Sequence, residues 1–296
     1  MKKSTTIISS KPLYDDELFS ITKKPRSYSD IININEIKNK IEATWKNTDT
    51  PEEFKGLLLQ IFRETLVDGS GIIKTRFLDK NNGAATVLEQ AFLMDNIIKL
   101  AHETIVEKLY RAPNPTQGEQ LCIVAVGGYG RGELAPFSDI DLLFLLPYKI
   151  TPHIEQVVEA ILYLLWDMRL KVGHSTRSIE ECMRQAKLDM TIRTAILESR
   201  FICGEISLLS EMNRKFQKQI VAGTALEFVE AKLKESESRH QRLGDSRYVI
   251  EPNIKDGKGG LRDLHKLFWI GKYVYQVNTV EALVMRGILS SQEATL

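Results

Sequence analysis

The sequence predicts an α/β (α+β) protein in which a small sheet is flanked by helices and followed by a helical domain. Two apolar runs, residues 122–126 and 140–146, lie on either side of a glycine-rich turn and indicate strand, turn and strand. Over most of the remaining chain, apolar residues recur at helical spacing. The predicted architecture is therefore a short stretch of strands between long helical regions.

Composition and charge narrow the class of protein. The 296 residues are 43% hydrophobic and 27% charged, which is enough for two domains with substantial cores. The net charge of +1 argues against a dedicated nucleic-acid-binding protein, because such domains usually have a strong basic excess. No apolar run approaches membrane-spanning length. We expect a cytoplasmic protein without nucleic-acid or membrane partners, whose thiols (Cys122, Cys182 and Cys203) lie in the core.

The chain before the predicted strands divides into a tail and a helical region. Residues 1–30 are rich in Ser, Lys and Pro and predict a mobile tail. Residues 31–115 predict an N-terminal helical region with a first helix from about residue 35. Capping and proline signals place a second helix over 51–67, and an amphipathic pattern places a third over 87–109. Asp95 and His102 lie near the apolar stripe of the third helix and receive no role.

Two aspartates lie at the start of the second predicted strand. Because side chains on a strand alternate between faces, Asp139 and Asp141 project to one side while Ile140 and Leu142 enter the core. Two carboxylates at this separation repel each other unless they share a proton or bind a cation. Magnesium favours such hard oxygen ligands and completes its shell with waters and phosphate oxygens. We therefore expect Mg²⁺ as the cofactor at this pair.

The glycine-rich turn supplies the complementary chemistry. Gly127, Gly128 and Gly130 can adopt positive φ and let backbone N–H groups close around an anion. Arg131 adds a fork of donors suited to phosphate oxygens. A pair of aspartates on a strand or a glycine-rich turn is a weak signal when found alone. Together they predict transfer of a phosphorus group from a nucleoside triphosphate.

These motifs also carry a family resemblance. The stretch GGYGR followed by SDID resembles the nucleotidyltransferase superfamily of DNA polymerase β, and the longer GGYGRGEL..SDIDLL resembles the bacterial protein-PII uridylyltransferase/uridylyl-removing family. The resemblance implies a polymerase β-like core with a small mixed sheet over residues 116–190. It also implies a magnesium-dependent nucleotidyltransferase that moves UMP from UTP to a tyrosine of PII and releases pyrophosphate. The site residues implied are Asp139 and Asp141 for catalysis and metal, and Gly127, Gly128, Arg131 and Ser138 for substrate.

A second motif lies in the expected helical domain, residues 191–296. The segment EPNIKDGKGGLRD, residues 251–263, is a glycine-rich loop that opens a helix, and a helix N-terminus can bind phosphate. Alone it is equally typical of a surface loop. It resembles a segment that follows the transferase domain in the same uridylyltransferase family, which implies that Lys255 and Arg262 bind substrate.

The superfamily brings a third carboxylate to the metal pair from a later strand. Here a helix is predicted from Thr151 to about Asp167, and an alternating pattern predicts a strand over 170–177 that contains no carboxylate. Asp167 is the candidate third ligand, with a surface charge at a helix end as the alternative interpretation. A further helix should begin after Ser178.

The resemblance also bears on what the chain does not contain. Family members continue into a hydrolytic domain with a His-Asp pair and then into regulatory domains, whereas this sequence has no His-Asp dipeptide. We expect a C-terminally truncated fragment or short relative that adds the nucleotide and does not remove it. Two alternatives stay open: nucleotide transfer to another protein or a small molecule, and a non-catalytic module that binds nucleotide or PII.

Overall fold

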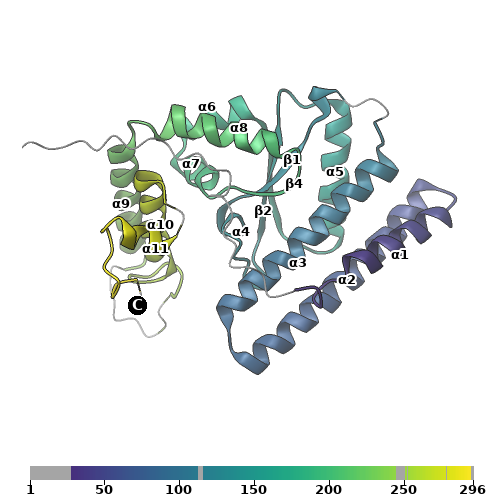
Figure 1. Cartoon of the computed structure of the whole chain (residues 1–296), viewed down its shortest axis with the longest axis horizontal. Helices are drawn as coiled ribbons and strands as arrows, with labels where there is room; N and C mark the ends of the chain where they lie inside the picture. Colours follow the sequence, from purple (N-terminus) through teal and green to yellow (C-terminus); the bar gives the residue numbers. More distant parts are fainter. Residues whose placement is uncertain (1–27, 113–115, 245–250, 252, 278, 295–296) are drawn as a thin grey trace, which may run out of the picture.

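The centre of the molecule is a four-stranded mixed sheet (Figure 1). The structure, a computed structural model, describes residues 28–112, 116–244, 251, 253–277 and 279–294. In the order β3-β2-β1-β4, β1 pairs antiparallel with β2 and β4, while β2 pairs parallel with β3. The bounds are Cys122–Ala125 (β1), Ile140–Leu146 (β2), Val172–Ser178 (β3) and Arg200–Gly204 (β4). The predicted α/β class with a small mixed sheet is confirmed.

The two central strands, β1 and β2, are buried on both faces, which explains why they are continuous apolar runs. Ile123 and Phe144 point into a core shared with the N-terminal helices and the helix after β2. Val124 and Leu145 point into a second core on the opposite face, shared with helices later in the chain. The alternation of adjacent residues between the two cores fixes the register of the central pair.

Three N-terminal helices cover one side of the molecule: α1 (Ile34–Lys46), α2 (Pro51–Lys80) and α3 (Gly83–Thr104), which continues into a π-helical turn, Ile105–Leu109. Thr50 caps α2 by accepting from the N–H of Glu53, as predicted. The predicted end of α2 near residue 67 is wrong. The helix passes through Gly69 because that glycine packs under Leu93 of α3, where a Cβ would lie 2.7 Å from the leucine side chain.

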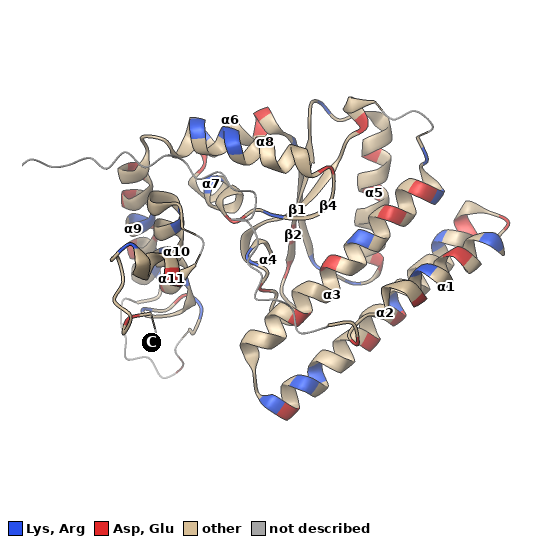
Figure 2. Ribbon diagram, in the orientation of Figure 1, with Lys and Arg blue, Asp and Glu red and all other residues tan. Residues whose placement is uncertain are grey.

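Charged residues of both signs occur along α1, α2 and α3 (Figure 2). An ion pair between Arg76 of α2 and Glu89 of α3, at 2.8 Å, joins two of these helices, and Arg76 also contacts Asp30. The predicted mobile tail, residues 1–30, lies outside the described residues except for 28–30.

The helix α5, Pro152–Asp167, carries the chain from β2 to the parallel strand β3. Thr151 caps it, and Ser178 caps α6 (Ile179–Leu188) by accepting from the N–H of Glu181. Both predicted helix starts are confirmed.

The expectation of an all-helical chain after residue 190 is wrong, because β4 pairs with the free edge of β1. Its sequence, RFICG, is short, apolar and partly β-branched, which suits an edge position in the sheet. The helices around and after it are α7 (Met190–Leu197), α8 (Ile206–Phe216), a π-helical segment (Gln217–Val221), α9 (Ala225–Arg242), α10 (Leu261–Tyr275) and α11 (Val280–Met285).

The sequence from Thr224 to Glu227 also predicts a capping box at the start of α9, and this prediction is wrong. The Thr224 hydroxyl contacts the Tyr273 hydroxyl at 2.7 Å and the carbonyl of Ile220 instead of an N–H of α9. The contact joins the beginning of α9 to α10, and the Tyr273 ring stacks on Phe228 with centroids 3.9 Å apart.

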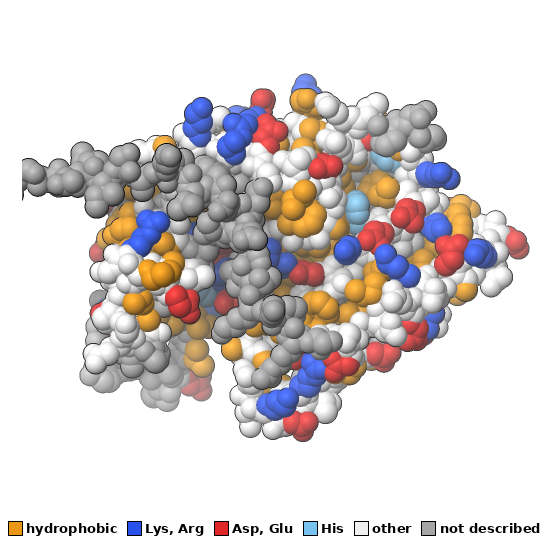
Figure 3. All heavy atoms as spheres, viewed as in Figure 1, with side chains coloured by type: hydrophobic (Ala, Val, Ile, Leu, Met, Phe, Trp, Pro, Cys, Tyr) orange, Lys and Arg blue, Asp and Glu red, His pale blue; other side chains and the backbone are white. Residues whose placement is uncertain are grey.

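The C-terminal helices α9, α10 and α11 form a group beside α4 (Gly127–Gly130) and α7 (Figure 1). Phe228, Trp269 and Tyr273 belong to the second core, so this group and the sheet share one packed interior. Hydrophobic side chains also reach the surface over these helices (Figure 3), among them Leu261, Leu264 and Leu267 of α10. Within the described residues, no helix is both long and apolar enough to span a membrane.

Candidate functional site

The glycine-rich segment forms a single helical turn, α4 (Gly127–Gly130), directly after β1. Gly127 has φ +61°, a backbone conformation that favours glycine. At Gly130 a Cβ would lie 2.0 Å from the carbonyl oxygen of Glu198, so only glycine allows α4 to approach the end of α7 this closely. The turn is therefore fixed in place by its backbone.

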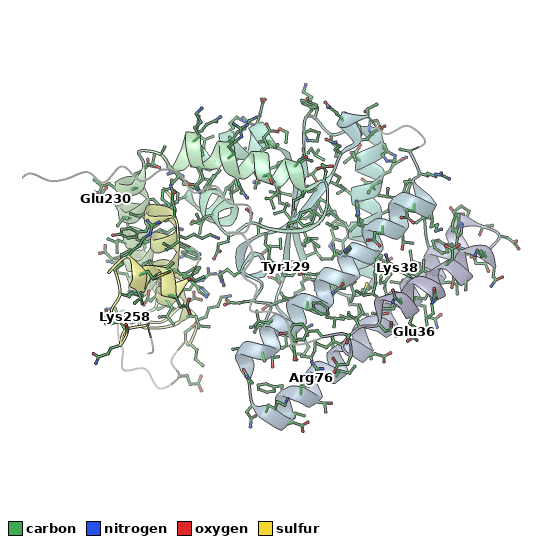
Figure 4. All side chains as sticks on the ribbon, viewed as in Figure 1. Glu36, Lys38, Arg76, Tyr129, Glu230 and Lys258 are labelled. Atoms are coloured by element: carbon green, nitrogen blue, oxygen red, sulfur yellow. The ribbon has the colours of Figure 1, made fainter. Side chains whose placement is uncertain are left out.

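Tyr129 anchors this turn to α3 and lies between them in Figure 4. Its hydroxyl donates to Asp95 Oδ1 at 2.6 Å, and Arg200 of β4 donates to both oxygens of the same carboxylate, at 2.6 and 3.0 Å. The Arg200 guanidinium also lies over the Tyr129 ring, 5.3 Å from its centroid. Burial, followed by the charge of Asp95, raises the pKa of Tyr129, so the hydroxyl stays protonated as a donor. Asp95, to which no role was assigned, thus positions the site.

The two predicted metal ligands lie at the start of β2, beside the turn. Asp139 is exposed and immediately precedes the strand, whereas Asp141 is half-buried within it. The Asp141 carboxylate lies between two glycine backbones: a Cβ at Gly173 would be 2.4 Å from Oδ1, and one at Gly127 would be 3.2 Å from Oδ2. Burial, with a smaller contribution from the charge of Asp139, raises the pKa of Asp141. The pair accumulates negative charge that a cation would relieve.

The donor set suits a hard cation with several exchangeable ligands. Within the described residues, no group of three or more His, Cys, Asp or Glu side chains is arranged to hold a metal. A cation at Asp139 and Asp141 would therefore take its other ligands from water and phosphate, which is the habit of magnesium. Asp167 lines a cavity with residues of α2 and α5, and its carbonyl accepts from Arg63, so the structure shows no contact between Asp167 and this pair.

Arg131 caps the turn and is already bonded to protein groups. Its guanidinium donates to Glu198 at 2.7 Å, to Glu133 at 3.1 Å and to Nε2 of His265 in α10 at 3.2 Å. Glu198 is almost completely buried. Because arginine has five N–H donors, some remain for a ligand. Arg131 therefore connects the sheet to α10, in addition to its predicted phosphate role.

The glycine-rich turn, through Arg131, and the segment 251–263, through Lys255 and Arg262, come together around His265. Burial, with smaller contributions from the nearby charges of Arg131, Arg262 and Lys255, lowers the pKa of His265 to about 4. The imidazole is therefore neutral at neutral pH, with Nε2 accepting from Arg131. Its Nδ1 is buried without a hydrogen-bond partner among the described residues. Cations from the core and from the loop before α10 thus surround one uncharged ring.

Lys272 of α10 adds a further cation near Arg131. Burial, together with the charge of Arg131, lowers the pKa of Lys272, while Glu198 opposes this effect. Within the described part of the chain, no hydrogen bond or ion pair joins its ammonium to another side chain. An anion held between these cations would satisfy the charge of Lys272 and offset the repulsion around it.

Asp263 holds the loop before α10 in place. Its carboxylate accepts from Arg239 at 2.6 Å, from the Gly259 N–H at 2.8 Å and lies 3.1 Å from His240 Nε2. Burial alone would raise the pKa of Asp263, but these contacts and the charge of Lys266 outweigh it and keep the carboxylate ionised. Lys255 is exposed and Arg262 lies 3.7 Å from Asp256, so both side chains remain near the surface.

Comparison with known families identifies both motifs. Residues 116–202 match the family model of the nucleotidyltransferase domain, and residues 227–296 match that of the GlnD PII-uridylyltransferase family. The chain therefore contains a nucleotidyltransferase domain followed by a segment of the GlnD PII-uridylyltransferase family. The nucleotidyltransferase match includes all of β1, β2 and β3 and reaches into β4. The resemblance indicated by the motifs is therefore confirmed.

Curated relatives give the same result. The chain is 50% identical over 264 residues to a bifunctional uridylyltransferase/uridylyl-removing enzyme of Azospirillum brasilense, covering 89% of this chain and 28% of the relative. It is 52% identical over 274 residues to the enzyme of that name from Rhodospirillum rubrum, covering 92% and 29%. It is 50% identical over 248 residues to the enzyme of that name from Rhodopseudomonas palustris, covering 84% of this chain and 27% of the relative. The chain thus spans less than a third of the length of these relatives.

Proposed function

We propose that this nucleotidyltransferase transfers UMP from UTP to a tyrosine of the PII protein and releases pyrophosphate, with Mg²⁺ as cofactor. The proposal rests on the convergence of the Asp139–Asp141 pair, the α4 turn and the cations around His265. The identity to uridylyltransferases supports the choice of uridine nucleotide and of PII as partner. Three buried free thiols are compatible with the reducing cytoplasm in which we place it.

The residues divide the reaction between them. Asp139 and Asp141 would hold the metal, which neutralises phosphate charge and favours the ionised acceptor oxygen. The N–H groups of the α4 turn, with Arg131 and Ser138, would hold the triphosphate beside that pair. Lys255, Arg262 and Lys272 would approach the leaving end from the C-terminal segment. The acceptor oxygen attacks the α-phosphorus and forms the new O–P bond. The bond between the α-phosphorus and the oxygen that bridges it to the β-phosphate breaks, and pyrophosphate leaves. The proton of the acceptor hydroxyl passes to solvent.

A transfer assay with four nucleotides tests the proposal. The protein is incubated with purified PII, MgCl₂ and each α-labelled nucleoside triphosphate in turn, and labelled PII and pyrophosphate are measured together. We expect label from UTP alone, with one pyrophosphate per labelled tyrosine, and none with Asp139→Asn. Label from ATP instead would reject the uridylyl assignment. Nucleotide binding without any pyrophosphate release would favour the non-catalytic module.

A further inference from the structure

A strained turn directly precedes Asp139 and Asp141. Residues Ala135 to Ser138 form a β-turn in which the Ser138 N–H donates to the Ala135 carbonyl at 3.1 Å. Pro136 occupies the second position and Phe137, with φ +66°, the third. A positive φ at the third position of such a turn is typically met by glycine, because a Cβ is disfavoured there. Phe137 therefore holds a backbone conformation that is unfavourable for an aromatic residue.

The Phe137 side chain gains nothing from folding that would offset this strain. It is 98% exposed, the highest value among the large hydrophobic side chains of the described residues. An exposed ring on a strained backbone stabilises neither the turn nor the core. Such an outlier is explained more readily by function than by stability.

The turn also occupies a place that an acceptor must pass. Phe137 lies two residues before Asp139, and Ser138 and Asp139 are exposed beside it. A hydroxyl that attacks a nucleotide at Asp139 and Asp141 therefore reaches a site whose exposed edge is two residues from Phe137. A protein acceptor covers roughly 800 Å² around its contact point, which is wide enough to include the turn.

We propose that Phe137 is the anchor by which this enzyme binds its protein acceptor, the ring entering an apolar pocket beside the acceptor tyrosine. The inference rests on the proposed function, since it requires a folded protein as acceptor. Aromatic rings are enriched at the centres of protein interfaces. The competing role, stacking on the nucleobase, fits less well, because a ring that is 98% exposed has no neighbouring wall to enclose a base.

Two substitutions separate this role from a structural one. Phe137→Gly removes the ring and relieves the positive φ, whereas Phe137→Leu keeps an apolar side chain. With PII varied at saturating UTP, Phe137→Gly should raise KM for PII at least tenfold and leave kcat unchanged. With UTP varied at saturating PII, KM for UTP should equal that of the parent. Its Tm should rise by about 2–4 °C. Phe137→Leu should lose less affinity. Tyr148→Ser, an exposed aromatic after the far end of β2, is the control and should behave like the parent.

The outcomes are distinguishable from failure of the proposed function. If the parent transfers UMP and Phe137→Gly has the parent KM for PII, the anchor role is overturned. A raised KM for UTP would overturn it in favour of base stacking. Direct binding of PII, followed by fluorescence anisotropy without nucleotide, should also weaken at least tenfold in Phe137→Gly. A parent that neither binds PII nor modifies it overturns the proposed acceptor and this inference together.

Discussion

The hydroxyl of Tyr129 donates to Oδ1 of Asp95 at 2.6 Å, and this contact joins the α4 turn to the middle of α3. Tyr129 is buried, and the same carboxylate is bonded by Arg200 of the edge strand. Three segments far apart in the sequence are therefore bonded to one another at a single carboxylate. The position of α4, and with it the N–H groups of the turn, depends on that arrangement.

Removing only the Tyr129 hydroxyl should measure the contact. Tyr129→Phe keeps the buried ring but leaves Asp95 with Arg200 alone, so we expect the free energy of unfolding to fall by about 1.5–3 kcal/mol, as for hydrogen bonds to charged groups. Urea denaturation gives the difference. Tyr148→Phe, which removes an exposed hydroxyl, is the control. Equal loss in both variants would mean that the contact adds no specific stability.

Much of the core of the site could be predicted from local sequence. The alternation of apolar residues around Asp141 defined β2, and the Thr151 and Ser178 caps defined the helices on either side of β3. These features depend on residues within a few positions of one another. Of the three glycines expected to allow positive φ, Gly127 adopts it, whereas Gly128 and Gly130 do not.

The supporting residues could not be predicted in this way. Asp95, Glu198 and His265 contact partners 34, 67 and 134 positions away. On a helix, an isolated polar residue looks the same whether it meets solvent or a buried arginine. The one available signal was Asp95, a carboxylate between Met94 and Ile97 within a stripe of apolar residues. β4 was missed for a similar reason, since five residues pair with a strand nearly eighty positions earlier.

Asp141→Asn should abolish transfer and stabilise the metal-free protein. Losing a ligand should lower kcat by about 10²- to 10⁴-fold. The folded-state pKa of Asp141 is raised by burial, so its contribution to stability is present when it is protonated and lost as pH rises through that pKa. At pH 7 without metal, Asn should therefore give a higher Tm than the parent. That gain should vanish at pH 3, and near-parental transfer would refute the metal assignment.

Arg131→Lys and Arg262→Ala should both weaken triphosphate binding, but only Arg131→Lys should also lower stability appreciably. A lysine cannot donate to Glu198, Glu133 and His265 together, so Arg131→Lys should lower both stability and triphosphate affinity. Arg262 lies near the surface, so Arg262→Ala should weaken triphosphate binding with little change in Tm. Calorimetric titration with UTP, alongside thermal unfolding, tests both. Unchanged affinity in Arg262→Ala would make its loop a structural turn.

His265 should report the charge of its surroundings. Its folded pKa of about 4 lies below the ordinary value of 6.5, so the stability it contributes is present above pH 6.5 and is lost as pH falls from there toward 4. His265→Gln should reduce the fall in Tm between pH 7 and pH 5. A bound triphosphate should offset the cations and raise the pKa, which NMR of labelled histidine can follow. An unchanged pKa with saturating nucleotide would place the phosphates elsewhere.

Lys272→Met should separate phosphate binding from base binding. The ammonium is partly buried near Arg131 and has no hydrogen-bond or ion-pair partner within the described part of the chain, so a phosphate oxygen would add a direct partner to the more distant charge of Glu198. Losing one charge-assisted hydrogen bond corresponds to about 10- to 100-fold in affinity for UTP. UMP, which lacks the β- and γ-phosphates, should bind both proteins equally, and Lys272→Arg should recover part of the loss. Lys234→Met, at an exposed position of α9, controls for the change in net charge. Removing a partly buried charge also relieves its desolvation, so Lys272→Met should not be less stable than the parent. A lower Tm, with equal loss of affinity for UTP and UMP, would identify Lys272 as a packing residue instead.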